Sequence, residues 1–310
     1  MMKSGMDLIS IHDLSAGDVE EILALAADLK VRQKAGIPHP LLAGKTLGMI
    51  FEKSSTRTRV SFEVGMYQLG GQALFLSSRD LQLGRGEPIA DTARVLSRYL
   101  DGIMIRTYGH ERIEELARWA DVPVINALSD LLHPCQALTD LLTIREHKGR
   151  LAGLKMAYVG DGNNMTHSLM YAAAKVGMHF AAATPAGYEP NEKVVQNARA
   201  DASETGASVT LTHDPKEAVR DADVVVTDTW ASMGQEEEHD ARTAVFRPYQ
   251  VNPELLAAAD ARAVVMHCLP AYRGEEITED VFESFADVIF DEAENRLHVQ
   301  KAIMALVMGG

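Results

Sequence analysis

An apolar run that leads into hydroxyls and arginines, LGMIFEKSSTRTR at residues 47–59, decides how this chain is interpreted. The segment Thr46–Phe51 is typical of a buried strand, and the apolar residues after Thr56 recur with helical spacing. A helix that starts at Ser55–Thr58 leaves backbone N–H groups unpaired and carries a partial positive charge there. With the guanidinium of Arg57 beside it, this start predicts a site for a small dianion. Alone, the stretch fits a capped surface helix about as well.

The alternation of strand and helix continues along the chain. Helices are predicted at Ser15–Gln33, after Thr56, after Pro88, after His110, at Leu138–His147 and at Ala293–Met308. Strands are predicted at Thr46–Phe51, Ala73–Leu76, Gly102–Ile105, Val122–Asn126, Lys155–Val159, His179–Ala183, Ser208–Thr212, Asp223–Thr227, Ala263–His267 and Val288–Phe290. Strands that alternate with helices form parallel sheets covered on both faces. We therefore expect an α/β protein with two doubly wound parallel-sheet domains.

Length and composition fit two soluble domains. The 310 residues are about twice the length of a typical domain. A net charge of −14 argues against nucleic acid as a partner, because binding a phosphate backbone requires a basic face. No apolar run is long enough to cross a membrane, and the start lacks the apolar core of a signal peptide. The two cysteines, Cys135 and Cys268, form no disulfide framework, so a reducing cytoplasm is expected.

Chemically active residues lie at the ends of the predicted strands. In chain order they are Ser55–Thr58, Arg106, His133, Asn164, Asp228 and Cys268. Open parallel sheets bind their ligands beyond the carboxyl ends of the strands, so these residues share one kind of position. We expect the active site to be a cleft between the two domains.

Four motifs, in this order, resemble those of the carbamoyltransferases. STRTR at 55–59, HPCQ at 133–136 and HCLP at 267–270 resemble the signatures of the class, and DTWASMGQ at 228–235 narrows the resemblance to the ornithine carbamoyltransferases. The resemblance extends from about residue 6 to the C-terminus. It implies transfer of the carbamoyl group of carbamoyl phosphate to the side-chain amine of L-ornithine, giving L-citrulline and phosphate in arginine biosynthesis.

The resemblance also implies domain roles and an assembly. Residues 1–146 would bind carbamoyl phosphate, with the C-terminal helix of about 293–310 packed back on them, and residues 147–310 would bind ornithine. The loop that holds Gln82 would reach the active site of a neighbouring subunit, which implies a homotrimer with shared sites. Assemblies larger than a trimer are left open.

Individual residues take their roles from the same resemblance. Those assigned to carbamoyl phosphate are Ser55, Thr56, Arg57, Thr58, Gln82, Arg106, His133, Gln136, Cys268, Leu269 and Arg296. Those assigned to ornithine are Asn164, Asp228, Ser232 and Met233. Four are expected to act in catalysis, Arg106 and His133 on the carbonyl oxygen, and Asp228 and Cys268 on the amine. Which group accepts the amine proton stays open.

No metal and no cofactor are expected. His267, Cys268 and Cys135 lack the paired ligands close in sequence that a metal site requires, and arginines supply the positive charge. Gly160-Asp161-Gly162 follows a predicted strand as in a dinucleotide site, but Met165 occupies the third glycine position.

Other substrates and an inactive protein are the alternatives. Aspartate carbamoyltransferase is disfavoured, because it would carry a lysine in the loop around Gln82 and residues 77–87 contain none. Enzymes for putrescine, lysine or N-acetylornithine reuse the carbamoyl phosphate half, and Ser232-Met233-Gly234 disfavours them. An inactive scaffold paralogue would have lost motif residues, and all are present here.

Overall fold

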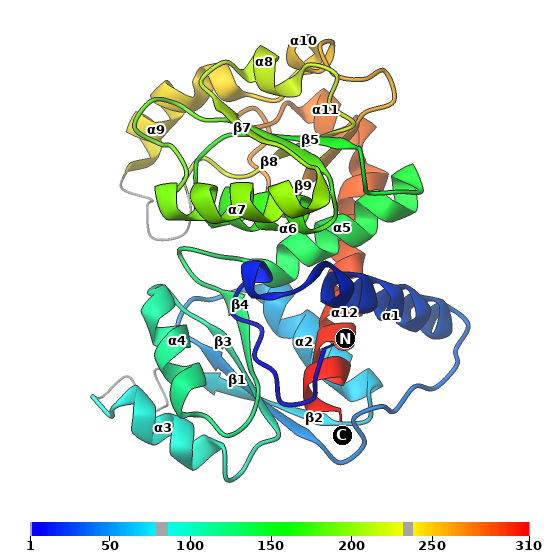
Figure 1. Ribbon diagram of the computed structural model, residues 1–310, viewed down its shortest axis with the longest axis vertical. Helices are drawn as coiled ribbons and strands as arrows, with labels where there is room; N and C mark the ends of the chain where they lie inside the picture. Colours follow the sequence, from blue (N-terminus) through cyan, green and yellow to red (C-terminus); the bar gives the residue numbers. More distant parts are fainter. Residues whose placement is uncertain (1, 79–85, 232–237, 310) are drawn as a thin grey trace. The chain divides into compact units, whose positions relative to one another are not determined.

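The computed structural model describes residues 2–78, 86–231 and 238–309, which form two compact units (Figure 1). One unit consists of Met1–Leu142 with Glu294–Gly310, and the other of Thr143–Ala293. Each contains a parallel sheet flanked by helices, so the predicted α/β class with two parallel-sheet domains is confirmed. None of the helices within the described ranges is long and apolar enough to span a membrane.

The first unit has a four-stranded sheet in the order β2-β1-β3-β4. Its strands are β1 (Thr46–Phe51), β2 (Gln72–Ser77), β3 (Gly102–Arg106) and β4 (Val124–Leu128). The helices that belong to it wholly or in part are α1 (Ala16–Lys34), α2 (Thr56–Gln68), α3 (Ile89–Leu96), α4 (His110–Trp119), α5 (Pro134–Lys148) and α12 (Ala286–Met308), after a 3-10 turn η1 (Ile11–Asp13). The strand order reverses between β1 and β3, which makes their carboxyl ends the expected ligand-binding position.

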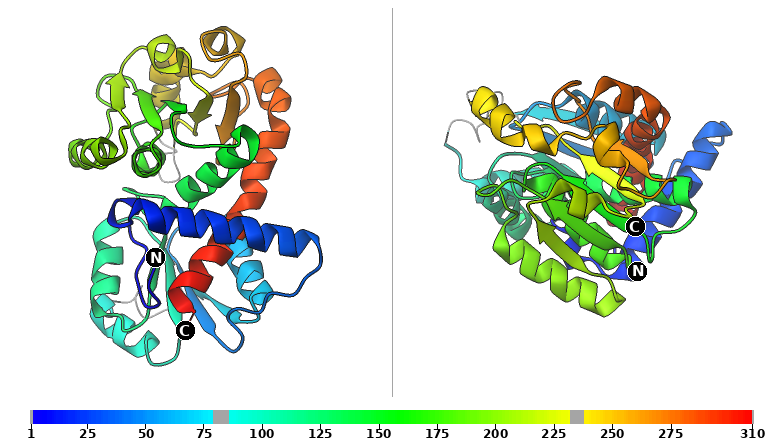
Figure 2. Two further views of the ribbon diagram at one scale, coloured as in Figure 1. Left: turned by 45° about the vertical axis from the view of Figure 1, so that its right-hand side comes forward. Right: turned by 90° about the horizontal axis from the view of Figure 1, so that it is seen from above.

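Helices cover both faces of this sheet (Figures 1 and 2). On one face, α3 and α4 enclose a core that includes Ile103, Ile113 and Leu116. On the other, α2 packs closely on α12, because a Cβ atom at Gly65 would lie 3.1 Å from Met304 Cε. This contact fixes the C-terminal helix against the helix that begins in the STRTR motif.

The second unit has a five-stranded sheet in the order β7-β6-β5-β8-β9. Its strands are β5 (Lys155–Val159), β6 (His179–Ala183), β7 (Val209–Thr212), β8 (Val224–Thr227) and β9 (Val264–His267). Its helices are α6 (Asn164–Lys175), α7 (Glu192–Thr205), α8 (Pro215–Val219), α9 (His239–Phe246), η4 (Arg247–Tyr249), α10 (Pro253–Leu256) and α11 (Glu279–Ser284). In Figures 1 and 2, α6 and α7 lie side by side on one face. Here the strand order reverses between β5 and β8.

One predicted strand is wrong. Val288–Phe290 lies in α12, which begins at Ala286. The buried positions Ile289, Glu292 and Arg296 follow one another at spacings of three and four, as on one face of a helix. Three adjacent apolar residues were too short a segment to distinguish a strand from a helix. The other predicted strands are present, and their ends are shifted by at most two residues.

Candidate active site

The start of α2 presents unneutralised positive charge to a ligand. Ser55 caps the helix, since its Oγ accepts a hydrogen bond from the N–H of Thr58 at 3.2 Å. The first turn contains no acidic residue, so the positive end of the helix dipole is not neutralised there. Phe51 at the end of β1 pairs in register with Arg106 at the end of β3. The point where strand order reverses therefore brings Arg106 next to the helix start.

Three residues assigned to carbamoyl phosphate meet in one hydrogen-bond network. Arg296, on α12, donates through Nη2 to the hydroxyl of Thr58 at 2.9 Å and through Nη1 to Oε1 of Gln136. Gln136 in turn donates to Asp140 at 2.8 Å. The side chains of Arg296, Thr58 and Gln136 are 3%, 1% and 1% exposed. A buried guanidinium that joins two motifs and the last helix is a preorganised cation at this site.

His133 lies among the same cations. Burial, and then the positive charges of Arg296, Arg106, Lys53 and Arg57, lower the pKa of His133 well below its ordinary value. The imidazole is therefore neutral at physiological pH, and a neutral imidazole can donate one hydrogen bond to a carbonyl oxygen. The HPCQ motif of His133 also contains a thiol, that of Cys135. Burial raises the pKa of Cys135 to about 12, so this thiol is no nucleophile.

The lowered pKa of His133 predicts a stability that depends on pH. The unfolded chain binds a proton at this residue below a pH of about 6.5, while the folded protein resists protonation there. Stability is therefore complete above the unfolded pKa and falls, by up to about 1.4 kcal/mol per pH unit, as the pH drops below it. Urea unfolding at pH 7.5 and 5.5 measures this loss. His133→Gln should lose less stability over that interval than wild type, and equal losses would contradict the assignment.

Lys53 was not identified as a site residue from the sequence, although it lies two residues before the first motif. Its side chain is 6% exposed, with Nζ 3.3 Å from Asp130 Oδ1 and 5.0 Å from the ring centre of Tyr108. Its charge lowers the pKa of His133, so it adds a fourth cation around that imidazole. A lysine that follows a buried strand and precedes the anion motif was the available signal.

Glu52 was also missed, and it connects the ends of β1 and β3. Its carboxylate accepts from Arg112 at 2.6 Å and from the hydroxyl of Thr107. Its backbone N–H donates to the carbonyl oxygen of Arg106 at 2.9 Å. Glu52 therefore holds the strand end that carries Arg106. The three partners lie 54 to 60 positions away in the sequence, so no local pattern indicated them.

In the second unit, Asp228 and Cys268 lie side by side after neighbouring strands. The Cys268 thiol donates to Oδ1 of Asp228 at 3.2 Å, and the same oxygen accepts from the N–H of Thr229 at 2.8 Å. The pairing of Thr227 with His267 in β8 and β9 sets this register. Asp228 is 8% exposed and Cys268 is half-buried. A carboxylate and a thiol so placed can both face an amine.

The predicted ornithine residue Asn164 lies close to this pair. Asn164 is the first residue of α6, which follows β5, the strand next to β8. Its neighbour Asn163 caps the helix and also donates to Oδ2 of Asp228 at 3.3 Å. Asn163 thus orients the carboxylate from the helix end. It is a further contributor that the sequence did not single out.

The buried histidine of the HCLP motif has both ring nitrogens in hydrogen bonds. His267 Nδ1 accepts from the N–H of Leu269 at 2.9 Å, and Nε2 lies 2.9 Å from Oε1 of Glu276. Potential ligand atoms of Asp228, His267 and Cys268 lie within 4.8 Å of one another. A metal at these three residues would have to break a bond of the imidazole, so the donor set is poor for one. Leu269 has a φ of 61°, a left-handed conformation that costs roughly 1–3 kcal/mol and is concentrated at functional sites.

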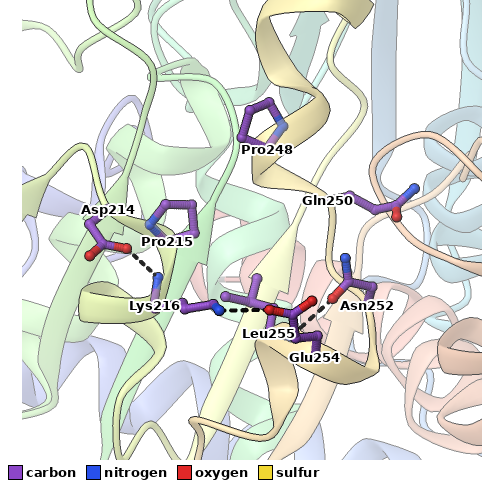
Figure 3. Close-up of a pocket in the computed structure, with 8 residues that line it drawn as sticks. All are labelled: Asp214, Pro215, Lys216, Pro248, Gln250, Asn252, Glu254 and Leu255. Carbon is purple, nitrogen blue, oxygen red and sulfur yellow. Dashed lines mark hydrogen bonds and ion pairs between the residues drawn. The ribbon is translucent and has the colours of Figure 1, made fainter.

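Three predicted residues, Gln82, Ser232 and Met233, lie outside the described residues. A hollow of about 210 Å³ in the second unit is lined by none of the predicted site residues (Figure 3). Its lining includes Lys216 and Glu254, whose ion pair spans 2.7 Å. Both side chains are more than half exposed, and an exposed pair of this kind contributes little. The hollow therefore has no part in the site.

Comparisons with known proteins agree with this arrangement. Residues 6–146 match the family profile "Aspartate/ornithine carbamoyltransferase, carbamoyl-P binding domain", and residues 152–307 match "Aspartate/ornithine carbamoyltransferase, Asp/Orn binding domain". The chain therefore belongs to the aspartate/ornithine carbamoyltransferase family.

Individual relatives narrow the comparison to one activity. The ornithine carbamoyltransferase of Carboxydothermus hydrogenoformans is 63% identical over 305 residues, covering 98% of each chain. An anabolic ornithine carbamoyltransferase of Pyrococcus furiosus is 59% identical over 307 residues, covering 99% of this chain and 98% of the relative. A solved structure of ornithine carbamoyltransferase from the same organism superposes with a TM-score of 0.97 at 58% identity, covering 100% and 99% of the two chains.

Proposed function

We propose that this enzyme transfers the carbamoyl group of carbamoyl phosphate to the side-chain amine of L-ornithine. The observation that carries the proposal is the network in which Arg296 joins Thr58 and Gln136, next to a neutral His133. This network would form a dianion site from three separate parts of the chain. The relatives named above are ornithine carbamoyltransferases, which favours ornithine over putrescine, lysine or N-acetylornithine.

The first unit would bind the phosphate and polarise the carbonyl. The start of α2 offers backbone N–H groups and the hydroxyls of Ser55, Thr56 and Thr58, and Arg57 adds a bidentate donor. Arg106 would lie between phosphate and carbonyl. His133 would donate to the carbonyl oxygen as negative charge develops there, while Gln136 accepts from the carbamoyl NH2 group. With Gln82, Arg296 and the Cys268–Leu269 backbone, these groups are our proposal for the carbamoyl phosphate site.

The second unit would bind and orient ornithine. Asn164, Ser232 and Met233 would hold its amino-acid end, and Asp228 and Cys268 would face the side-chain amine. The ammonium loses one proton before its nitrogen attacks the carbonyl carbon, and the C–O bond to phosphate then breaks. The nitrogen gives up a second proton as citrulline forms, so the products are citrulline, hydrogen phosphate and one released proton. The proposal also assigns ornithine to a domain of residues 147–310. It assigns carbamoyl phosphate to a domain of residues 1–146, with the helix of 293–310 packed back on it.

Cys268→Ser is expected to affect ornithine more than carbamoyl phosphate. A serine hydroxyl can still donate to Asp228, but it is smaller than the thiol and far less acidic. We expect a KM for ornithine raised roughly tenfold and an altered pH profile, with the KM for carbamoyl phosphate changed much less. Steady-state kinetics between pH 6 and 9.5 measures both. Unchanged ornithine kinetics and an unchanged profile would remove the thiol from the mechanism.

A homotrimer with shared sites is part of the proposal. Exposed apolar side chains on α2 and on the edge strand β2 support it. They are Val60 (53% exposed), Val64 (37%), Tyr67 (80%), Leu74 (39%) and Phe75 (39%). An exposed edge strand with apolar side chains is a surface that proteins normally cover. A second copy of the chain would cover this surface, and Gln82 follows β2 by five residues in the sequence.

A cytoplasmic location and a role in arginine synthesis also belong to the proposal. Both cysteines are free thiols, which fits a reducing compartment. One relative is named as anabolic, which favours the direction toward citrulline.

A bisubstrate analogue, with a phosphonate joined to ornithine, tests the proposed function against the alternative of an inactive scaffold. The analogue should raise the melting temperature of the enzyme, whereas a scaffold without the site should show no shift.

A further inference from the structure

We propose that Glu276 is a positioning residue of the active site, which fixes the Cys268–Leu269 turn by holding His267 in one tautomer. Glu276 lies outside the HCLP motif, in the segment between β9 and α11. This inference rests on the proposed function, since it assumes that the turn bears on the carbamoyl transfer. It adds a residue that no motif and no named domain assigns.

The hydrogen bonds of His267 determine which ring nitrogen carries the proton. The backbone N–H of Leu269 donates to Nδ1 at 2.9 Å, so Nδ1 must present a lone pair. In a neutral ring the proton then resides on Nε2, which lies 2.9 Å from Oε1 of Glu276. The side chains of His267 and Glu276 are both fully buried, so water does not compete for this bond. The carboxylate thereby selects the tautomer that leaves Nδ1 free to accept.

Glu276 is itself held in place by the backbone. Its Oε1 also accepts from the N–H of Tyr272 at 2.7 Å, and its carbonyl oxygen accepts from the N–H of Val251 at 2.8 Å. Its second carboxylate oxygen has no hydrogen-bond partner among the described residues. A buried carboxylate is costly to retain in that condition. The side chain therefore acts through Oε1, which accepts hydrogen bonds from both His267 and Tyr272.

The turn beyond His267 needs this support. Leu269 adopts a φ of 61°, which a residue with a side chain occupies only when its surroundings hold it there. The bond from its N–H to His267 is one such constraint, and the preceding residue, Cys268, donates to Asp228 at 3.2 Å. If the imidazole protonates at Nδ1 instead, two N–H groups face each other and the turn moves. Small displacements of reacting groups, on the order of 1 Å, can cost about 100-fold in rate.

Two substitutions at Glu276 separate its role as an acceptor from its charge. Glu276→Gln keeps an oxygen that can accept from His267 and Tyr272, so kcat should stay within about threefold of wild type. Glu276→Ala removes the acceptor, and kcat should fall roughly 10- to 100-fold while the KM for carbamoyl phosphate changes little. His267→Asn is the matched background, because its amide oxygen can accept from Leu269 without any tautomer. On that background Glu276→Ala should have no further effect.

A spectroscopic readout tests the tautomer without relying on activity. In protein labelled with ¹⁵N-histidine, and assigned by comparison with His267→Asn, wild type should show His267 as the pure Nε2–H tautomer. Folded Glu276→Ala should show a mixture. Wild-type kcat in folded Glu276→Ala, an Nδ1–H signal in wild type, or a loss in Glu276→Gln equal to that in Glu276→Ala would each overturn the proposal. If wild type makes no citrulline, the proposed function fails, while the tautomer signals still decide whether Glu276 controls His267.

Discussion

Arg296→Ala is expected to lower kcat/KM for carbamoyl phosphate by roughly 100- to 1,000-fold. The substitution removes the buried guanidinium that joins Thr58 to Gln136, and losing one preorganised donor to a developing charge costs about that much. It also removes the positive charge that lowers the pKa of His133 more than any other nearby charge does. The pKa of His133 should rise toward its ordinary value, so the acidic limb of the rate profile should move to higher pH. Initial rates across pH 5.5–8 measure both effects.

Arg32→Ala is the matched control in the same unit. Arg32 pairs with Asp28 on the outer face of α1, and its side chain is 43% exposed. An exposed ion pair of this kind contributes at most about 1 kcal/mol, so this variant should retain wild-type kinetics. If folded Arg296→Ala kept wild-type kcat/KM and an unshifted profile, the guanidinium would be structural only.

Asp228→Asn is expected to lower kcat with ornithine by roughly 100- to 10,000-fold, the range for loss of a positioned acid–base group. The carboxylate accepts hydrogen bonds from Cys268, Thr229 and Asn163 and has a site left to face the ammonium. An amide carries no charge and presents an NH2 group at one of these positions. Substrate binding in the first unit should survive, so the affinity for carbamoyl phosphate, measured by calorimetry, should remain near wild type.

Asp240→Asn controls for the loss of one negative charge in the second unit. Asp240 lies on α9 and is fully exposed. Its substitution should therefore change neither kcat with ornithine nor the affinity for carbamoyl phosphate. If Asp228→Asn turned over ornithine at the wild-type rate, the amine would have to be oriented by other groups. If Asp228→Asn lost carbamoyl phosphate binding as well, the assignment of carbamoyl phosphate to the first unit and of ornithine to the second would be wrong.

The fold was largely predictable because parallel strands buried on both faces are short apolar runs bounded by polar residues. β1, β5 and β6 begin and end where the sequence indicated. β4 begins at Val124, two residues later than expected, because a strand end depends on its partner and not on local composition. The strand predicted at Val288–Phe290 was wrong for a related reason: the helical spacing of its apolar residues can be recognised only together with the residues that follow.

The site was predictable where residues lie in motifs and not where they support them. Thr58, Gln136 and Arg296 were named from a resemblance, although the hydrogen bonds from Arg296 to the other two span up to 238 residues of sequence. Asn163 and Glu52 were missed, because each acts on a residue that the sheet brings near. Glu276 was missed for another reason: it lies nine residues beyond His267, in a segment that carries no motif. Asn163 contacts Asp228 only because β5 and β8 are adjacent strands. Such roles depend on strand order, which the sequence does not state.

The most direct test of this account is citrulline formation from carbamoyl phosphate and L-ornithine, with aspartate, putrescine, lysine and N-acetylornithine assayed in parallel. We expect carbamoyl transfer to ornithine and to none of the other four amines. This result would require both the cations around His133 in the first unit and the Asp228–Cys268 pair in the second. Transfer to a different amine would keep the carbamoyl phosphate half and contradict the ornithine half. No transfer to any of the five by folded protein would contradict the proposed function as a whole.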